Sequence, residues 1–333
     1  MALSEFSLIQ QYFSSLGKAP GIALGVGDDG AVLDIPEGEQ LVVTVDTLVA
    51  GVHFPFDASP GDIARRALRV NLSDIAAMAA QPRWFTLALT LPEANESWIQ
   101  QFSQALAEDA ALFGCALVGG DTTAGPLSIS IQVLGTVPRG KALTRSGAQV
   151  GDSIYVTGSL GEGAAALSIV GDNSKLIVPE LTIIDNKEAK ELLLQRFYRP
   201  EPRLLDGFRL RGLASAALDI SDGLVADLDH IAESSGLGAE IEFEKLPIAP
   251  WLLALMKTSP EPACITEWVL SGGDDYELCF TVPKENRHAV DLLIQQGELS
   301  ACNIGQMTKQ LGVRCFDAQG DLMDIKKMGY QHF

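Results

Sequence analysis

The segment from Gly25 to Phe54 reads GVGDDGAVLDIPEGEQLVVTVDTLVAGVHF, and it holds six carboxylates without a lysine or an arginine. The gap in basic residues extends from Lys18 to Arg65. Two carboxylates about 4 Å apart repel by roughly 4 kcal/mol at an effective dielectric constant near 20. Acidic residues held in a glycine loop between apolar runs need an external positive charge, and we expect metal ions to supply it.

Two places in this segment are suited to metal binding. Asp28 and Asp29 lie in a loop between glycines, while Thr44 and Asp46 occupy alternate positions of a predicted strand. Side chains at alternate strand positions share a face. Oxygen ligands of this kind suit magnesium or calcium rather than zinc. An ordinary surface turn and an ordinary aspartate near a strand end remain the alternative.

Asp74 lies in the small and apolar helical stretch NLSDIAAMAA. A carboxylate buried there is costly unless it is paired or bound to a metal. The sequence leaves two kinds of partner open, a metal ion or one of the nearby arginines Arg66 and Arg69.

Three further Gly/Asp clusters occur where predicted strands run into loops. The motifs are VGGDTT, LDISDGL and LSGGDDYEL, and their polar residues are Asp121, then Asp219, Ser221 and Asp222, then Asp274 and Asp275. One such cluster is weak evidence, but solvated turns do not account for the repetition. The pattern favours several carboxylate sites for cations.

Two phosphate-binding motifs are matched only superficially. GVGDDG fits the dinucleotide fingerprint GxGxxG, but that fingerprint follows a strand and opens a helix, whereas here it follows the turn-rich KAPGIAL and leads into a strand. GTVPRGKA lacks the Ser or Thr that a P-loop needs after lysine, and Pro138 removes a backbone N–H. The glycines of residues 156–167 could either present N–H groups to a phosphate or form a simple tight turn.

The four histidines do not cluster. His53 follows the acidic strand and could face a substrate or cap the strand end. No nucleophile–histidine–acid arrangement is evident, so we expect no catalytic side-chain nucleophile.

The chain has 333 residues, 47% of them hydrophobic, with a net charge of -19 and a pI near 4.5. This composition is globular, and the charge argues against nucleic acid or an anionic membrane as a partner. The five scattered cysteines are typical of reduced thiols in a cytoplasmic protein. We expect no signal peptide and no transmembrane segment.

Strand and helix patterns alternate along the whole chain and predict an α+β fold of two domains. The turn-rich, basic residues 138–152 mark the boundary, which gives domains 1–140 and 141–333. Helices are predicted at residues 4–17, 60–80, 96–114, 161–170, 192–197, 202–213 and 225–236. Strands are predicted at residues 31–35, 40–49, 84–91, 115–121, 127–137, 153–158, 216–220, 239–246, 276–282 and 312–317.

In this order, the motifs GVGDDGAVL, TVDTLVAGVHF, NLSDIAAMAA, VGGDTTAGP, ALTRSGAQVGD, YRPEPR, DISDGL and SGGDDYELCFT closely resemble those of the thiamine-monophosphate kinase family. The resemblance covers essentially the whole chain. That family belongs to the ATP-binding superfamily of aminoimidazole ribonucleotide synthetase, whose fold is called PurM-like.

The resemblance implies an N-terminal α/β domain that binds ATP and metal and pairs its strands with those of a second subunit, and a larger C-terminal α+β domain. It implies a homodimer that converts ATP and thiamine monophosphate to ADP and thiamine diphosphate with several Mg²⁺ ions. The nucleophile would be an anionic phosphate oxygen, so a strong general base is unnecessary, and direct in-line transfer depends on positioning and charge neutralisation.

The resemblance also implies roles for individual residues. Magnesium ligands are Asp29, Thr44, Asp46, Asp74, Asp121, Asp219 and Asp222. ATP contacts are Gly120, Asp121, Arg145 and Ser221. Contacts to thiamine phosphate are His53, Asp274 and Tyr330.

Two positions depart from the family pattern. Asp274 stands where the family commonly has glutamate, so its contact to substrate would be lost or mediated by water. Ala79 stands where a glycine is common, and we expect this to affect only helix packing. Aminoimidazole ribonucleotide synthetase-like activity and a non-catalytic module that binds ATP or divalent cations remain the rival functions.

Overall fold

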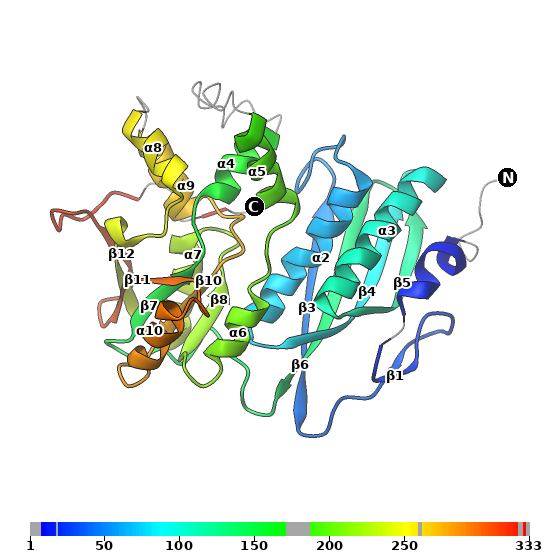
Figure 1. Ribbon diagram of the computed structural model, residues 1–333, viewed down its shortest axis with the longest axis horizontal. Coiled ribbons are helices and arrows are strands. Elements are labelled where there is room, and N and C mark those ends of the chain that lie inside the picture. The colour runs from blue at the N-terminus through cyan, green and yellow to red at the C-terminus, as the bar shows by residue number, and fades with distance from the viewer. Residues whose placement is uncertain (1–7, 18, 171–186, 259–261, 326–328, 331–333) are drawn as a thin grey trace. The chain divides into compact units, whose positions relative to one another are not determined.

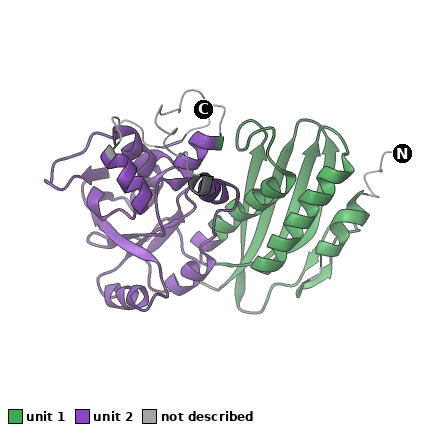
Figure 2. Cartoon of the chain, turned by 45° about the horizontal axis from the view of Figure 1, so that its top comes forward, with its two compact units in different colours: residues 1–75, 80–140, 170–172 green, residues 76–79, 141–169, 173–333 purple. Residues whose placement is uncertain are grey.

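A computed structural model describes residues 8–17, 19–170, 187–258, 262–325 and 329–330 (Figure 1). The chain divides into two compact units (Figure 2). Unit 1 comprises residues 1–75, 80–140 and 170–172, and unit 2 comprises residues 76–79, 141–169 and 173–333.

Unit 1 is built on a four-stranded sheet in the order β3-β6-β4-β5. Its strands are β3 (Glu39–Val49), β4 (Gln81–Leu91), β5 (Ala116–Ala124) and β6 (Ser128–Pro138). β4 and β5 are parallel, and the other pairs are antiparallel. A small antiparallel hairpin precedes the sheet and consists of β1 (Ile22–Leu24) and β2 (Val32–Leu33).

Two long helices, α2 (Pro60–Ala77) and α3 (Glu96–Phe113), lie across this sheet (Figure 1). The Asn95 side chain accepts the Trp98 N–H at 3.1 Å and caps the start of α3, and Gly114 ends it with a left-handed φ of 68°. The Asp109 carboxylate of α3 accepts hydrogen bonds from Arg65 Nη1 and Arg69 Nε of α2, each at 2.6 Å. These charged bonds fix one helix against the other.

The strand β3 shows the alternation that a half-covered sheet requires. Val42 and Leu48 are buried, whereas Val43 and Val45 are 48% and 56% exposed. Apolar side chains on the open face of a sheet are typical of a surface that another chain covers.

Unit 2 contains a six-stranded sheet in the order β12-β9-β11-β7-β10-β8, in which only the β12–β9 pair is parallel. The strands are β7 (Ser153–Thr157), β8 (Ala216–Asp219), β9 (Gly238–Glu242), β10 (Leu278–Val282), β11 (Ala301–Thr308) and β12 (Gly312–Phe316). The helices are α4 (Glu162–Val170), α5 (Lys187–Tyr198), α6 (Leu204–Leu210), α7 (Leu224–Ser235), α8 (Pro250–Thr258), α9 (Pro262–Ser271) and α10 (Arg287–Gln295), with a 3₁₀ turn η4 (Phe243–Lys245).

The predicted α+β class is confirmed, and most predicted elements are present. The first predicted helix differs in type: residues 4–7 lie outside the described residues, and the remainder forms a π-helical turn η1 (Ile9–Phe13) and a 3₁₀ turn η2 (Ser14–Leu16). β1 lies in the stretch that was expected to be turns, and β11, α8, α9 and α10 were not predicted. Because GVGDDG joins β1 to β2 and opens no helix, it is not a dinucleotide fingerprint.

Ala79 has a larger consequence than the expected change in helix packing. It follows α2 with a φ of 54°, and its N–H bonds to Ala76 O at 2.9 Å. A left-handed residue after a helix is usually glycine, because a side chain there costs about 1 kcal/mol or more. Ala79 therefore carries backbone strain.

In the part of the chain that the structure describes, none of the helices has both the length and the apolar character needed to cross a bilayer.

Candidate functional site

The β1–β2 loop and strand β5 enclose a cavity of about 450 Å³ in unit 1. Its lining includes Asp28 and Asp29 from the loop and Gly120 and Asp121 from the strand. The three aspartates are exposed, and no ion pair joins them to a cationic side chain among the described residues. We call Asp28, Asp29 and Asp121 the cavity acids. Three predicted site residues, Asp29, Gly120 and Asp121, thus border one space.

The motif VGGDTT does not lie where a strand runs into a loop, as predicted, because β5 continues through it to Ala124. Gly120 is paired with Leu87 of β4, and a Cβ added to Gly120 would lie 1.9 Å from Leu87 O. The glycine is therefore required by the close approach of two strands. That approach brings the next residue, Asp121, to the cavity.

Strand β3 and helix α2 hold a second group of predicted ligands. The Thr44 hydroxyl donates to Asp74 Oδ2 at 2.6 Å, and the backbone N–H of Asp46 donates to Asn71 Oδ1 at 2.9 Å. Asp74 is half-buried rather than fully buried. Of the two arginines that were considered as its partners, Arg69 donates to Asp109 and Arg66 donates to His53 O.

His53 lies four residues beyond the end of β3. Its Nδ1 accepts the Val49 N–H at 3.0 Å, so the ring caps the strand end. An accepting Nδ1 puts the proton of a neutral imidazole on Nε2. Of the two interpretations left open by the sequence, the structure supports the cap directly.

In unit 2, β8 delivers Asp219 into the loop that contains Ser221 and Asp222. One carboxylate oxygen of Asp227, in the first turn of α7, accepts the N–H groups of Ser221, Asp222 and Gly223 at 3.1, 3.0 and 3.1 Å. Burial and the nearby charge of Asp222 raise the pKa of Asp227 to about 7, although these three bonds oppose the shift. Asp227 was not among the predicted site residues, although an acid in the first turn of a helix after SDG is a capping signal.

The segment SGGDDYEL lies against this loop. The N–H of Asp274 donates to Ser221 O and that of Tyr276 to Ile220 O, both at 2.8 Å. The N–H of Tyr330 donates to Asp222 O at 3.0 Å, and its side chain is 51% exposed. The structure thus brings the predicted residues Ser221, Asp222, Asp274 and Tyr330 together in unit 2.

Arg145 is exposed, and the residue before it is bonded to β8. The backbone N–H of Ala217 in β8 donates to Thr144 O at 2.9 Å. Thr144 precedes Arg145, and Ala217 lies two residues before Asp219 in β8. The backbone next to Arg145 is therefore held close to the end of β8 that leads into the acidic loop.

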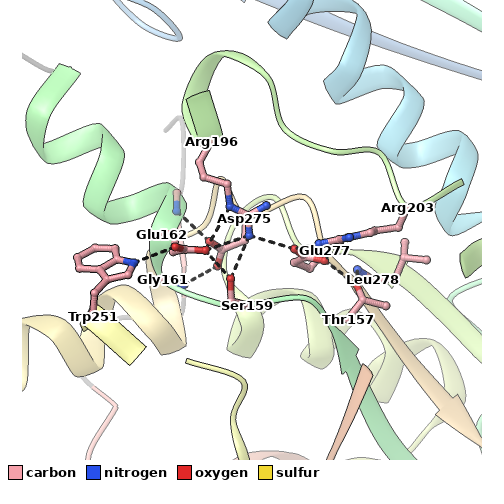
Figure 3. Close-up of polar contacts among 11 residues, drawn as sticks. Thr157, Ser159, Gly161, Glu162, Arg196, Arg203, Trp251, Asp275, Glu277 and Leu278 are labelled. Carbon is pink, nitrogen blue, oxygen red and sulfur yellow. Dashed lines mark hydrogen bonds and ion pairs between the residues drawn. The ribbon is translucent and has the colours of Figure 1, made fainter. Parts of the chain in front are cut away.

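The glycine loop before α4 does not present all its N–H groups outward. Those of Gly161 and Gly163 donate to the two carboxylate oxygens of Asp275 at 2.9 and 3.0 Å (Figure 3). Asp275 is buried, and burial raises its pKa to about 8. An internal carboxylate thus occupies the position that the sequence suggested for a phosphate.

Two buried acids beside this loop are matched by arginines. Glu277 receives a bidentate pair from Arg203 at 2.6 and 2.5 Å, and Arg196 reaches Glu277 at 3.3 Å and Glu162 at 3.0 Å (Figure 3). Burial acts to raise the pKa of Glu162. Hydrogen bonds from Ser159 and Trp251 and the charge of Arg196 outweigh burial, so this pKa is lowered. We call Glu162, Arg196, Arg203 and Glu277 the arginine network.

No three histidine, cysteine, aspartate or glutamate side chains form a ready metal cage among the residues described. Magnesium is usually held by one or two carboxylates together with substrate phosphates and water, so such a cage is not required for it. The oxygen donors Thr44, Asp46 and Asp74, together with the cavity acids, fit a hard divalent cation by their chemistry.

Comparisons with known proteins extend over the whole chain. Residues 27–137 match the family model "AIR synthase related protein, N-terminal domain", and residues 149–317 match "AIR synthase related protein, C-terminal domain". A thiamine-monophosphate kinase of Escherichia coli (strain K12) is 46% identical over 334 residues, which covers 100% of this chain and 99% of that protein.

Two solved structures extend this similarity to the fold. The crystal structure of a thiamine-monophosphate kinase from Stenotrophomonas maltophilia K279a is 42% identical, with a TM-score of 0.82, and the match covers 97% of this chain and 99% of that one. A structure described as AaThiL complexed with AMPPCP and TMP is 32% identical, with a TM-score of 0.74, and the match covers 99% of this chain and 97% of that one.

Proposed function

The chain belongs to the thiamine-monophosphate kinase family and has its two-domain PurM-like α+β fold, and we propose that it transfers the γ-phosphoryl group of ATP to thiamine monophosphate. The products are ADP and thiamine diphosphate, which makes this the last step of thiamine diphosphate biosynthesis. The observation that carries the proposal is 46% identity over the full length of a relative of that name. A relative that is 32% identical is described in complex with TMP and AMPPCP, an ATP analogue.

For the nucleotide, we propose contacts from Gly120, Asp121, Arg145 and Ser221. Arg145 is a donor that can form charge-assisted bonds to phosphate. Ser221 is exposed, and its backbone is held by the Asp227 cap, so its hydroxyl is available.

For magnesium, we propose oxygen ligation by two sets of residues. The ligands are Asp29, Thr44, Asp46, Asp74 and Asp121 in unit 1 and Asp219 and Asp222 in unit 2. Bound Mg²⁺ ions would neutralise the phosphates and so reduce the repulsion between two anionic substrates. The cavity acids are exposed and lack a cationic side-chain partner in the described residues, which supports this role.

For thiamine monophosphate, we propose contacts from His53, Asp274 and Tyr330. His53 caps the end of β3 through Nδ1, and the side chain of Tyr330 is 51% exposed. Asp274 is one methylene shorter than the glutamate common in the family, so we expect a longer or water-mediated contact.

The transfer is direct and in-line, without a phosphorylated side chain. The acceptor is already an anionic phosphate oxygen, so the chain has to position two substrates rather than generate a nucleophile. Incubation with radiolabelled ATP should leave no label on the protein. Stable labelling of a side chain would overturn the direct route.

We propose further that residues 1–140 form the ATP- and metal-binding and dimerisation domain and that residues 141–333 form the C-terminal domain. The exposed apolar face of β3 supports a homodimer built through the unit 1 sheet. All five cysteines lie in the described residues and none forms a disulfide, which is consistent with a cytoplasmic enzyme.

The deciding experiment mixes the purified protein with ATP, Mg²⁺ and thiamine monophosphate and separates the products by chromatography. We expect equal amounts of ADP and thiamine diphosphate, and no turnover after EDTA is added. ADP without thiamine diphosphate would indicate another activity of the superfamily. Binding of ATP without any turnover would indicate a non-catalytic module.

A further inference from the structure

The backbone around Asp274 is held in an unusual conformation. Asp274 and Tyr276 have φ values of 63° and 52°, in the left-handed region that residues with side chains rarely adopt. A strained conformation of this kind persists only where its surroundings determine it, and such sites often serve function. The contacts that hold this segment therefore indicate what it is held for.

The residue between these two is the main anchor. The Asp275 carboxylate points into the amino-terminal end of α4 and accepts the N–H groups of Gly161 and Gly163 (Figure 3). The backbones of Gly163 and Asp274 pack closely, because a Cβ added to Gly163 would lie 2.2 Å from Asp274 O. The hydrogen bonds of Asp275 thus hold the first turn of α4 against the backbone of Asp274.

The arginine network holds Glu277, which lies two residues after Asp275. Glu277 accepts the Thr157 hydroxyl at 2.7 Å as well as the Arg203 fork, which joins the strand after the segment to the strand before the glycine loop. A Cβ at Gly158 would lie 2.0 Å from Glu277 Oε1, so the loop passes directly over the pair. The segment that contains Asp275 is therefore also held at Glu277.

The side chain of Asp274 is directed by the residue on the other side of the anchor. The Tyr276 hydroxyl donates to Asp274 Oδ1 at 3.1 Å. Hydrogen bonds to a carboxylate oxygen restrict its orientation, and they do so at the position that the proposed function gives to a substrate contact.

We propose that Asp275 and Tyr276 are positioning residues for thiamine monophosphate, and that they act through Asp274. Asp275 fixes the left-handed backbone and Tyr276 fixes the carboxylate. The inference rests on the proposed function, and it explains how an aspartate is kept in place where the family resemblance implies a glutamate. The neighbouring loop that contains Ser221 bonds to this segment through two backbone N–H groups, but Asp227 also caps it with three backbone bonds, so we expect its shape to change less.

The test compares Asp275→Asn, Tyr276→Phe and Asp274→Ala with the full-length wild type. We expect Asp275→Asn to raise the KM for thiamine monophosphate about tenfold or more, since small displacements of positioning groups have effects of this size. Tyr276→Phe should raise it several-fold, and the KM for ATP should change less than about twofold in both, an ordinary limit for independent sites. Calorimetric titration with thiamine monophosphate should show the same loss of affinity.

The double variants separate positioning from a general effect. If Asp275 and Tyr276 act through Asp274, each substitution should add less than about twofold in the Asp274→Ala background. Full, multiplicative effects in that background would overturn the inference, as would an unchanged KM for thiamine monophosphate in both single variants. If Asp275→Asn does not fold, Tyr276→Phe decides the question, because it removes only one hydroxyl.

Asp152→Asn is the matched control. Asp152 is another buried carboxylate of unit 2 and accepts the Gln149 N–H at 3.0 Å and the Ser215 hydroxyl at 2.6 Å. It should lower the melting temperature without changing the KM for thiamine monophosphate. A wild type that does not convert this substrate would refute the proposed function, whereas an active wild type with unaffected variants would refute only the positioning role.

Discussion

The cavity acids of unit 1 and the arginine network of unit 2 solve the same electrostatic problem in different ways. Each gathers carboxylates within a folded unit. In the network, Glu277 is 1% exposed at its side chain and is neutralised by arginines. The cavity acids stay exposed, and among the described residues their one side-chain hydrogen bond is local, from the Asp29 N–H to Asp28 Oδ1 at 2.9 Å.

This difference separates a structural role from a binding role. A buried acid must bring its own counter-charge, because desolvation of an unpaired charge costs several kcal/mol. An exposed acid keeps its hydration and can exchange water for a cation when a substrate arrives. Substitutions in the two regions should therefore affect different measurements, metal-dependent activity in one and stability in the other.

The largest effect on activity should come from the proposed metal ligands on β3 and α2. Asp46→Asn and Asp74→Asn should each lose at least about tenfold in activity or in magnesium affinity, the usual size of changes around a metal. Steady-state rates measured over a range of Mg²⁺ concentrations test this. Asp62→Asn, the same change on the same helix, is the control, and wild-type kinetics in both ligand variants would remove Asp46 and Asp74 from the site.

The arginine network should show the opposite behaviour. Glu277→Gln leaves the half-buried Arg203 without the charge of its buried partner, and breaking a buried pair typically costs about 3–5 kcal/mol. Urea denaturation should record this loss to the same extent with and without Mg²⁺. Glu242→Gln, in the exposed pair with Lys245, should change stability by no more than about 0.5 kcal/mol. Equal effects of the two substitutions would contradict the structural role of the network.

Asp275 adds a pH dependence to unit 2. Because burial raises its pKa from 3.8 to about 8, the folded state keeps a proton that the unfolded chain releases. Its contribution to stability is therefore complete below about pH 4 and declines as the pH rises towards 8. The stability difference between wild type and Asp275→Asn should shift against the wild type over this range. A difference that does not vary with pH would show that Asp275 keeps an ordinary pKa.

The same contrast explains which parts of the molecule could be predicted from the sequence. The acidic, base-free segment 25–54 and the Gly/Asp motifs are local patterns, and they led to the cavity acids and to the loop after β8. The alternating and helical periods of β3, α2 and α3 are also local, and these elements are present.

The partners of the buried acids could not be predicted in this way. Asp275 is 114 positions from Gly161 and Glu277 is 120 from Thr157, so only the tertiary fold brings them together. The reason for a glycine at position 120 is equally non-local, because its constraint, the carbonyl of Leu87, lies on another strand. β11 could not be predicted from its sequence pattern, because residues such as Asn303 and Gly305 interrupt the alternation of apolar side chains.

The smallest effect should come from a cavity acid in the absence of metal. Asp29→Asn removes one of several neighbouring negative charges without breaking an ion pair, so the metal-free protein should keep its stability within about 0.5 kcal/mol or gain slightly. The stabilisation that wild type gains from Mg²⁺ with ATP should be reduced in the variant, because ligands that bind the folded state stabilise it in proportion to their affinity. Thermal melting with and without Mg²⁺ and ATP measures both quantities. A marked loss of stability in the metal-free variant would mean that Asp29 is a structural acid like Glu277, and the distinction between the two regions would fail.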